Sequence, residues 1–572
     1  MQKVWCFVLI LFIFLTDCAY SGDNDDIGLS TVYTGGLIYV KSGAEPIEAV
    51  VVKNGRFAYT GSLKGALLAG GQNCRRIDLE GCMMMPSFFD AHAHPNLASV
   101  FDLRELPYKG QVPTPEEYVA HIRQYLKNHP NIQIMRGSGW DNAAFSGGQP
   151  SKKLLDGVNN KIPIFIRSSD QHSAWVNSKT LELCGITKDT PDPQGGKIER
   201  DNTGEPSGTL RDEATITIES ALPQISIEEH KELILKFQKM AHELGITGYM
   251  CALVLPRSNH YKAYRELLVE KKLNTYTQLA FMMTPETYSD ALKWLAQENT
   301  AYKANNPGEL LDFRLAKFFM DGAILGQSAY LLEDYASRPG YKGEPMWPKD
   351  MVSLKDAFRQ CNKYGIRIHI HVIGDAATKL ALDALESETQ PNRHAITHLE
   401  LVEPEDIIRF KNNGIIATIN PYWFCKSTVW NEAELFHLGA ERSESMLKAK
   451  SFYNSDVTVA AASDYPVTSI PNPLIGIEMA VTRTLIEPWR GGRSAQECML
   501  NLGEAITVEQ AMDAFTLTAA YSYSLEKITG SIEIGKSADF IILDRNIFNC
   551  PPSEAKVVET WFRGNQVYKA KP

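Results

Sequence analysis

The feature that most constrains the fold is the alternation of strand-like and helix-like segments through the centre of the chain. Short runs rich in β-branched and aromatic residues predict strands at KIPIFIRS, NTYTQLAFMM, DFRLAKFFMDG, IRIHIHVIGD, HAITHLEL, GIIATINP and VTVAAASD. Amphipathic patterns lie between or beside them, and one begins with a capping box, Ser226 followed by Glu229, and ends at Gly245. Such alternation indicates a parallel sheet. With this many units we predict a barrel, and a doubly wound open sheet is the alternative.

Both ends of the chain differ from the centre. The segments STVYTGGLIYVKSGAEPIEAVVVKNGRFAYTGS and, near the C-terminus, GSIEIGKSADFIILDRNIF and VVETWFRGNQVYKA are rich in strand-forming residues and are interrupted by turns. We therefore predict one small sheet domain built from both ends. Between about residues 100 and 225 the alternation stops, and long stretches are rich in Gly, Pro and Asp. We interpret this region as a long insertion with loops that covers a site.

The first residues, MQKVWCFVLILFIFLTDCAYSG, predict export. Val4 to Leu15 form an unbroken apolar run that is shorter than the roughly 20 residues of a membrane-spanning helix. Ala19 and Ser21 are small residues suited to a cleavage site, so residues 1–21 are predicted to be a signal peptide and the mature protein to be periplasmic or secreted. An uncleaved membrane anchor and a lipid attached at Cys18 are the alternatives.

Charge and cysteine usage narrow the function class. The net charge is −10, and we find no basic run that would indicate nucleic acid as a partner. The ten cysteines are scattered without a C-x-x-C pair, which argues against a zinc finger and against a small disulfide-rich domain. With 572 residues, 44% of them hydrophobic, the chain can bury a large core in more than one domain.

Metal-ligand side chains recur where the predicted strands end, which is where barrels carry their catalytic groups. In FDAHAHP the two histidines are two residues apart, so they lie on one side of a strand and can bind the same ion. Each residue alone has an ordinary explanation, such as a salt bridge for the lysine or a helix cap for the aspartate. Together they predict a metal site, and the candidates are His92, His94, Lys317, His371, His398 and Asp464. His369 and His394 are interpreted as packing or positioning groups.

The motifs FDAHAHP, HVIGD, RHAITHLE and AASDYPV closely resemble those of the amidohydrolase superfamily, and most closely its YtcJ-like branch, which includes N-substituted formamide deformylases. Further motifs extend the resemblance over about residues 30–570. It implies a (β/α)8 barrel, expected over residues 87–528. It also implies a β-sandwich from both ends, expected over residues 22–86 and 529–572.

The resemblance also implies ligand roles. Lys317 is expected to be carboxylated, so that its carbamate bridges two ions. Imidazole and carboxylate ligands suit zinc, and another divalent metal is the alternative. His92, His94 and Asp464 are assigned to one ion, and His371 and His398 to the other. A relative with a single ion and an ordinary amine at Lys317 is the second hypothesis.

The expected reaction is hydrolysis of a non-peptide, amide-like C–N bond in a small molecule. A metal-activated hydroxide attacks the carbonyl group, and Asp464 accepts the proton and passes it to the leaving nitrogen. The candidates for substrate contacts are Trp140, Asp141, His172 and Asp321, with loop packing as the competing interpretation. Asn420 and Trp423 depart from the branch's usual pattern and are expected to face the substrate. A mononuclear relative acting on another amide, ester or imine, an exported non-enzymatic binding or regulatory protein, and a homodimer are left open.

Overall fold

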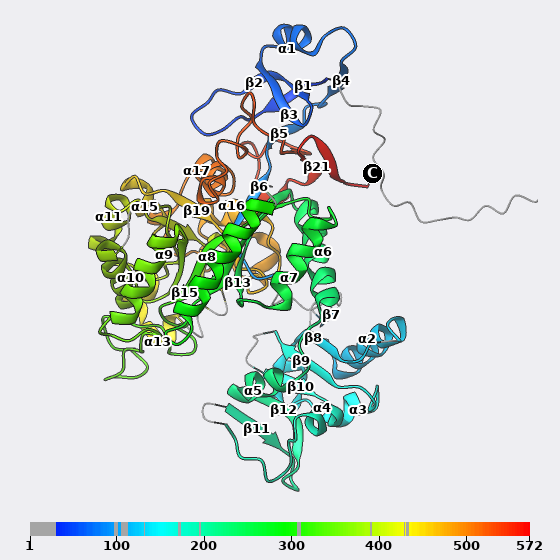
Figure 1. Ribbon diagram of the computed structural model, residues 1–572, viewed down its shortest axis with the longest axis vertical. Coiled ribbons are helices and arrows are strands. Elements are labelled where there is room, and N and C mark those ends of the chain that lie inside the picture. Colours follow the sequence, from blue (N-terminus) through cyan, green and yellow to red (C-terminus); the bar gives the residue numbers. More distant parts are fainter. Residues whose placement is uncertain are drawn as a thin grey trace, which may run out of the picture.

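The computed structural model describes residues 30–95, 101–103, 113–130, 132–169, 173–193, 196–305, 310–388, 392–427, 430 and 434–571. The predicted signal peptide and His172 lie outside the described residues. Three parts follow one another along the long axis of the molecule (Figure 1): a sheet made from both chain ends, a barrel, and the region inserted near the start of the barrel.

The central part is the predicted parallel barrel. Its strands follow the order β19-β18-β17-β16-β15-β14-β13-β6, and every paired neighbour is parallel. The strands are β6 (Phe88–Ala93), β13 (Ile246–Val254), β14 (Tyr276–Met282), β15 (Leu311–Phe319), β16 (Arg367–Val372), β17 (Ala395–His398), β18 (Ile416–Ile419) and β19 (Val459–Ala461). The prediction of a barrel is therefore confirmed, and the doubly wound alternative is wrong.

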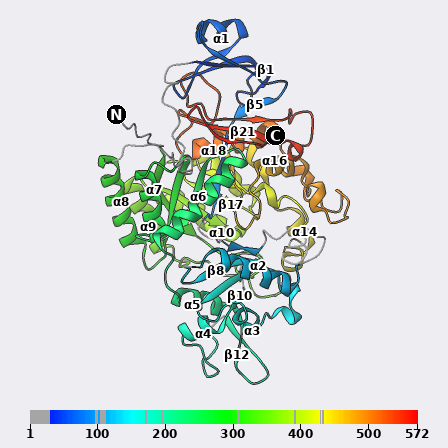
Figure 2. The ribbon, with the colours of Figure 1, turned by 90° about the vertical axis from the view of Figure 1, so that its right-hand side faces the viewer.

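Helices surround the barrel (Figures 1 and 2), and apolar side chains of the helices share one core with those of the strands. They include α6 (Ile227–Glu243), α7 (Asn259–Val269), α8 (Tyr288–Asn305), α9 (Val352–Tyr364), α10 (Asp375–Glu388), α11 (Pro404–Asn412), α16 (Pro473–Thr482), α17 (Val508–Ala514) and α18 (Leu517–Ser522), with short helices α13 (Phe436–Leu438), α14 (Ala440–Glu444) and α15 (Ala449–Asn454). Helix α6 begins with the predicted capping box of Ser226 and Glu229. Among the described residues, no helix has the length and apolar character needed to span a bilayer.

One barrel strand was assigned wrongly from the sequence. KIPIFIRS forms β9 (Ile164–Ser168) of the inserted region, whereas the second barrel strand is β13, with the sequence ITGYMCALV. β13 follows α6 after one turn at Gly245, whose φ is 80°. A glycine, a methionine and a cysteine weaken its strand signal, because they lack the β-branched or aromatic side chains that pack best on a pleated surface.

The predicted sheet from both ends is present. Its order is β22-β21-β20-β5-β1-β2-β3, and β4 pairs with β1. The N-terminal members are β1 (Thr31–Ile38), β2 (Ile47–Lys53), β3 (Arg56–Gly61), β4 (Arg75–Asp78) and β5 (Met83–Pro86), with helix α1 (Leu63–Gly70), and the C-terminal members are β20 (Phe540–Leu543), β21 (Val557–Phe562) and β22 (Asn565–Lys569). The two halves meet where β5 pairs antiparallel with β20.

The inserted region is a folded unit rather than the loop-rich segment expected from its composition. It contains a six-stranded sheet in the order β11-β12-β10-β9-β8-β7. The remaining strands are β7 (Phe101–Asp102), β8 (Met135–Trp140), β10 (Ser173–Val176), β11 (Gly196–Arg200) and β12 (Pro206–Asp212), and the helices are α2 (Pro115–Asn128), α3 (Lys152–Asp156), α4 (Ser178–Leu183) and α5 (Glu213–Ala221). The chain enters this region from the C-terminal end of β6, so the region lies beyond the end of the barrel where the strands end (Figure 2).

Candidate metal centre

The barrel brings the six predicted ligands together at the C-terminal ends of its strands. His92 and His94 lie at the end of β6, Lys317 lies on β15, His371 on β16, His398 at the end of β17, and Asp464 just after β19. His92 and Lys317 are 0% exposed, and only His371 is more than slightly accessible. Such a set of buried polar groups needs partners, because an unpaired polar group in a dry interior is costly.

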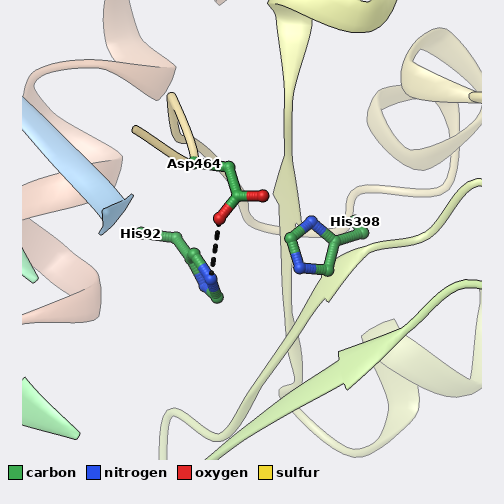
Figure 3. Close-up of side chains that lie close together, drawn as sticks. All are labelled: His92, His398 and Asp464. Carbon is green, nitrogen blue, oxygen red and sulfur yellow. Dashed lines mark ion pairs between the residues drawn. The ribbon is translucent and has the colours of Figure 1, made fainter. Parts of the chain in front are cut away.

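Three of these side chains direct their polar atoms at one another. Oδ1 of Asp464 is 3.3 Å from Nε2 of His92 and 3.1 Å from Nε2 of His94. The two Nε2 atoms are themselves 3.1 Å apart. His398 joins them from the other side, and one donor atom each from His92, His398 and Asp464 lie within 4.8 Å of one another (Figure 3).

The tautomers of the other two histidines follow from their acceptors. Nε2 of His371 is 3.2 Å from the carbonyl oxygen of Gly322, so that nitrogen donates and Nδ1 keeps its lone pair. Nδ1 of His398 donates to Oδ1 of Asn420 at 3.0 Å, which leaves the lone pair on Nε2. The two rings lie side by side, with centroids 4.6 Å apart.

Burial keeps the imidazoles of His92, His371 and His398 neutral. Desolvation, helped by the nearby Lys317, lowers the pKa of His371 to about 3 and the pKa of His92 well below its usual value. The pKa of His398 is likewise held low by burial and by its neighbour His371. Neutral imidazoles have the free lone pairs that metal ions require.

Lys317 has the most unusual environment. Among the described residues its Nζ has no hydrogen-bond partner, and it lies 4.7 Å from the ring centroid of Phe319. Burial lowers the pKa of this amine to about 7, although Asp464 acts in the opposite direction. Nδ1 of His94 is also buried without a partner in the described part of the chain. Nitrogen and carboxylate donors of this kind, on converging strand ends, fit a divalent ion such as zinc.

The backbone at two candidate ligands is strained. His398 has a φ of 75° and Asp464 a φ of 58°, both in the left-handed region that non-glycine residues avoid. Each such residue costs about 1–3 kcal/mol and persists only where the surroundings enforce it. The position of these two side chains is therefore maintained at the expense of local stability.

Asn420 and Trp423 contact a candidate ligand. Asn420 is fully buried, accepts from His398, and donates through Nδ2 to the carbonyl of Ala462 at 3.3 Å. The ring of Trp423 stacks on His398, with centroids 5.3 Å apart and an interplanar angle of 13°. Asn420 thus orients a candidate ligand, and the expectation that Asn420 and Trp423 face the substrate stays a prediction.

His369 contacts a candidate ligand, as expected for a packing or hydrogen-bonding group, whereas His394 lies at the other end of its strand from the ligand His398 and its interpretation as a positioning group is not supported. Nε2 of His369 lies 2.6 Å from Nδ1 of His92, and His369 pairs with Lys317 in the register of β15 and β16. His394 accepts from the N–H of Ile368 at 3.0 Å, near the start of β17. Both residues therefore support the ligands or the strands.

Two of the predicted substrate contacts, Trp140 and Asp321, have partners within the protein. Trp140 is 0% exposed in the core of the inserted region, and its Nε1 donates to Ile166 at 2.8 Å, so packing accounts for it. The carboxylate of Asp321 accepts from three backbone N–H groups, those of Tyr330, Ile373 and Gly374, and ties the loop after β15 to the loop after β16. Substrate roles for Asp141, at the end of β8, and for His172, which the structure does not describe, stay predictions.

A parallel barrel whose strand ends carry buried histidines, a lysine and an aspartate defines the class of metal-dependent barrel hydrolases. The sequence profile of the amidohydrolase family matches residues 75–568, and the chain belongs to this family. The protein is therefore a hydrolase acting on carbon–nitrogen bonds.

Individual relatives agree with this assignment over nearly the whole chain. The chain is 29% identical to Protein LONG AFTER FAR-RED 3 of Arabidopsis thaliana (94% of this chain, 91% of the relative) and 27% identical to the putative amidohydrolase YtcJ of Bacillus subtilis (95% and 100%). It is 27% identical to the N-substituted formamide deformylase of Arthrobacter pascens (90% and 92%). An uncharacterized metal-dependent hydrolase from Pyrococcus furiosus superimposes with a TM-score of 0.71 at 26% identity, covering 90% of this chain and 99% of that one. The resemblance to the YtcJ-like branch is thereby confirmed.

Proposed function

We propose that the protein hydrolyses an amide-like C–N bond in a small molecule at a site that holds two zinc ions. The observation that carries the proposal is the convergence of buried donors on one point, with Oδ1 of Asp464 within 3.3 Å of Nε2 on both His92 and His94. Two imidazoles and a carboxylate this close together suit a cation better than they suit one another.

Lys317 would complete the site as a carbamate. The neutral amine of Lys317 adds to carbon dioxide, an N–C bond forms and a proton is released, and the side chain becomes an anionic ligand with two oxygens. Two nearby divalent ions repel strongly at low dielectric. An anionic side chain at Lys317 would reduce that repulsion, whereas a protonated lysine would increase it.

In this proposal the metal ions activate water and the carbonyl group, and Asp464 transfers the proton. Bound metal ions lower the pKa of water to about 7 and polarise a carbonyl group. Asp464 has one oxygen directed at His92 and His94, and its second oxygen accepts the proton from the attacking water. The same carboxyl group passes that proton to the leaving nitrogen, which is necessary because an amide anion is a poor leaving group.

N-substituted formamides are the first substrates to test, because one relative is named as a deformylase of that class. N-acyl amino acids, cyclic amides and aryl esters complete the panel. The experiment measures bound metal and hydrolysis of the panel by the zinc-loaded protein, with Asp464→Asn as the matched inactive variant. About two ions per chain and hydrolysis that depends on Asp464 support the proposal.

Other results lead to other conclusions. About one ion per chain would favour the mononuclear alternative, in which Lys317 remains an amine. Neither metal nor hydrolysis in a folded preparation would refute the proposal and favour a binding or regulatory protein on the same scaffold.

A further inference from the structure

The barrel closes at a seam between its first and last strands, β6 and β19. β6 pairs with β13 and β19 pairs with β18, but within the described chain no strand ladder joins β19 to β6. Among the described residues two backbone hydrogen bonds cross this seam: the N–H of Asp464 donates to the carbonyl of His92 at 2.8 Å, and the N–H of His94 donates to the carbonyl of Tyr465 at 2.6 Å. The candidate ligands thus lie on both sides of a seam that has few backbone bonds.

The carboxylate of Asp90 connects the two sides directly. Its Oδ1 accepts from the N–H of Ser463 at 3.0 Å and from the N–H of His92 at 3.2 Å. Its Oδ2 accepts from the hydroxyl of Ser463, and that hydroxyl oxygen accepts from the N–H of Tyr465 at 2.9 Å. The side chain of Asp90 therefore binds Ser463, which immediately precedes Asp464, and the backbone of His92.

Asp90 acts only through other residues. It is 1% exposed and Ser463 is 0% exposed, so neither can reach a substrate. The residue that follows Ser463 is Asp464, whose left-handed backbone must be enforced by its surroundings. The bonds from Asp90 to Ser463 supply that enforcement from the β6 side.

We propose that Asp90 is a positioning residue that closes the barrel seam and holds Asp464 at the spacing from His92 and His94 that metal binding requires. This inference rests on the proposed metal-dependent function. Under this proposal Asp90 does more than stabilise the barrel. Loss of its hydrogen bonds would change the distance between the ligands on the two sides of the seam.

The test compares two buried aspartates that accept similar hydrogen bonds, one at the barrel seam and one away from it. Asp90→Asn keeps the size of the side chain but loses an acceptor and places an amide group against the hydroxyl of Ser463. Asp539→Asn is the matched control. Asp539 is also 1% exposed and accepts from the hydroxyl of Ser537 at 2.9 Å and the N–H of Arg563 at 2.7 Å, but it lies just before β20 of the sheet formed from both chain ends.

Zinc affinity is measured by competition with a chromogenic chelator, and the thermal midpoint of the metal-free protein is measured alongside. We expect Asp90→Asn to weaken zinc binding by about 10–100-fold, the usual effect of changing a group that orients a metal ligand. Asp539→Asn should lower the metal-free midpoint while leaving zinc affinity within about threefold of the wild-type value. Ser463→Ala, which removes only the hydroxyl bonds, should weaken zinc binding by less than Asp90→Asn but by more than the control.

A wild-type zinc affinity in folded Asp90→Asn would overturn the inference and leave Asp90 a purely structural residue. If that variant does not fold, Ser463→Ala decides in its place, and wild-type affinity in Ser463→Ala would overturn the inference equally. Failure of the proposed function looks different, because the wild-type protein itself would then bind no zinc and hydrolyse no member of the panel, and the positioning role would be rejected with it.

Discussion

Replacing Lys317 with methionine should stabilise the metal-free protein while weakening its metal binding. The side chain is 0% exposed and its Nζ has no hydrogen-bond partner among the described residues, so the attraction of Asp464 offsets only part of the cost of burying the charge. Methionine has similar length and no charge to desolvate. The substitution therefore separates the stability of the barrel from the function of its centre.

The magnitude follows from the pKa of the amine. Burial lowers this pKa from 10.5 to about 7. Each pKa unit corresponds to about 1.4 kcal/mol, so burying the amine of Lys317 costs up to about 5 kcal/mol at or below pH 7. Between the folded pKa of about 7 and the unfolded pKa of 10.5, Lys317 is protonated in the unfolded chain and neutral in the folded chain. The free energy of unfolding of the wild type therefore rises with pH over this range. The cost therefore shrinks to roughly 1.4 kcal/mol at pH 9.5 and vanishes above the unfolded pKa.

The assay is guanidinium unfolding of chelator-treated protein in buffer freed of carbon dioxide. We expect Lys317→Met to gain about 2–5 kcal/mol at pH 7 and much less at pH 9.5. Lys231→Met is the control, because that ammonium group pairs with Glu228, Glu266 and Glu270 and its loss should not stabilise the protein. Bicarbonate together with zinc should stabilise the wild type and not the methionine variant.

Two results would refute this reasoning. A methionine variant that is less stable than the wild type at pH 7, or equally stabilised at both pH values, would show that Lys317 is not a desolvated amine. Wild-type zinc affinity in the variant would remove Lys317 from the ligand set.

Four further outcomes are expected. Asp464→Asn should lower turnover by at least about 100-fold with an unchanged circular dichroism spectrum, since the amide is no base near neutrality; steady-state kinetics that match the wild type would exclude Asp464 from proton transfer. Trp140→Ala should destabilise the inserted region by about 3–5 kcal/mol, as measured by unfolding, with kcat of the folded fraction within about twofold; a selective loss of turnover would instead return Trp140 to the substrate site. Chelation of the metal should abolish hydrolysis and lower the thermal midpoint, and zinc should restore both; activity that persists in metal-free protein argues against any metal chemistry. We also propose export with removal of residues 1–21, which N-terminal sequencing of the mature protein checks, and a mature chain that starts at Met1 contradicts it.

The barrel could be predicted because its evidence is local. Runs such as IRIHIHVIGD carry the strand pattern and the polar end in the same few residues, and period two places His369 and His371 on one face. The convergence of ligand-type residues follows once the strands are parallel, because all their C-terminal ends then meet. The position of these residues at strand ends was sufficient to predict the proximity of His92, His398 and Asp464.

What the sequence did not predict depends on which segments become neighbours. KIPIFIRS has a strand pattern in any sheet, and nothing within it shows that it pairs with β8 and β10 rather than with a barrel strand. Asn420 reaches His398 only because β18 lies beside β17. The enclosure of Trp140 likewise depends on a core that is assembled from distant parts of the inserted region. A side-chain partner across strands is a property of the packed sheet, not of the segment.

The sheet shared by the two chain ends has a consequence for biosynthesis. In the register of β5 with β20, Met83 pairs with Leu543, which is translated 460 residues later. At about 5–20 residues per second, the edge of β5 with its apolar residues Met83 to Met85 stays unpaired for roughly 20–90 seconds before its partner is translated. An exposed apolar strand edge is prone to pairing with other chains. Only a chain translated to its last strands can cover that edge, so prematurely terminated products remain open to aggregation and to proteases.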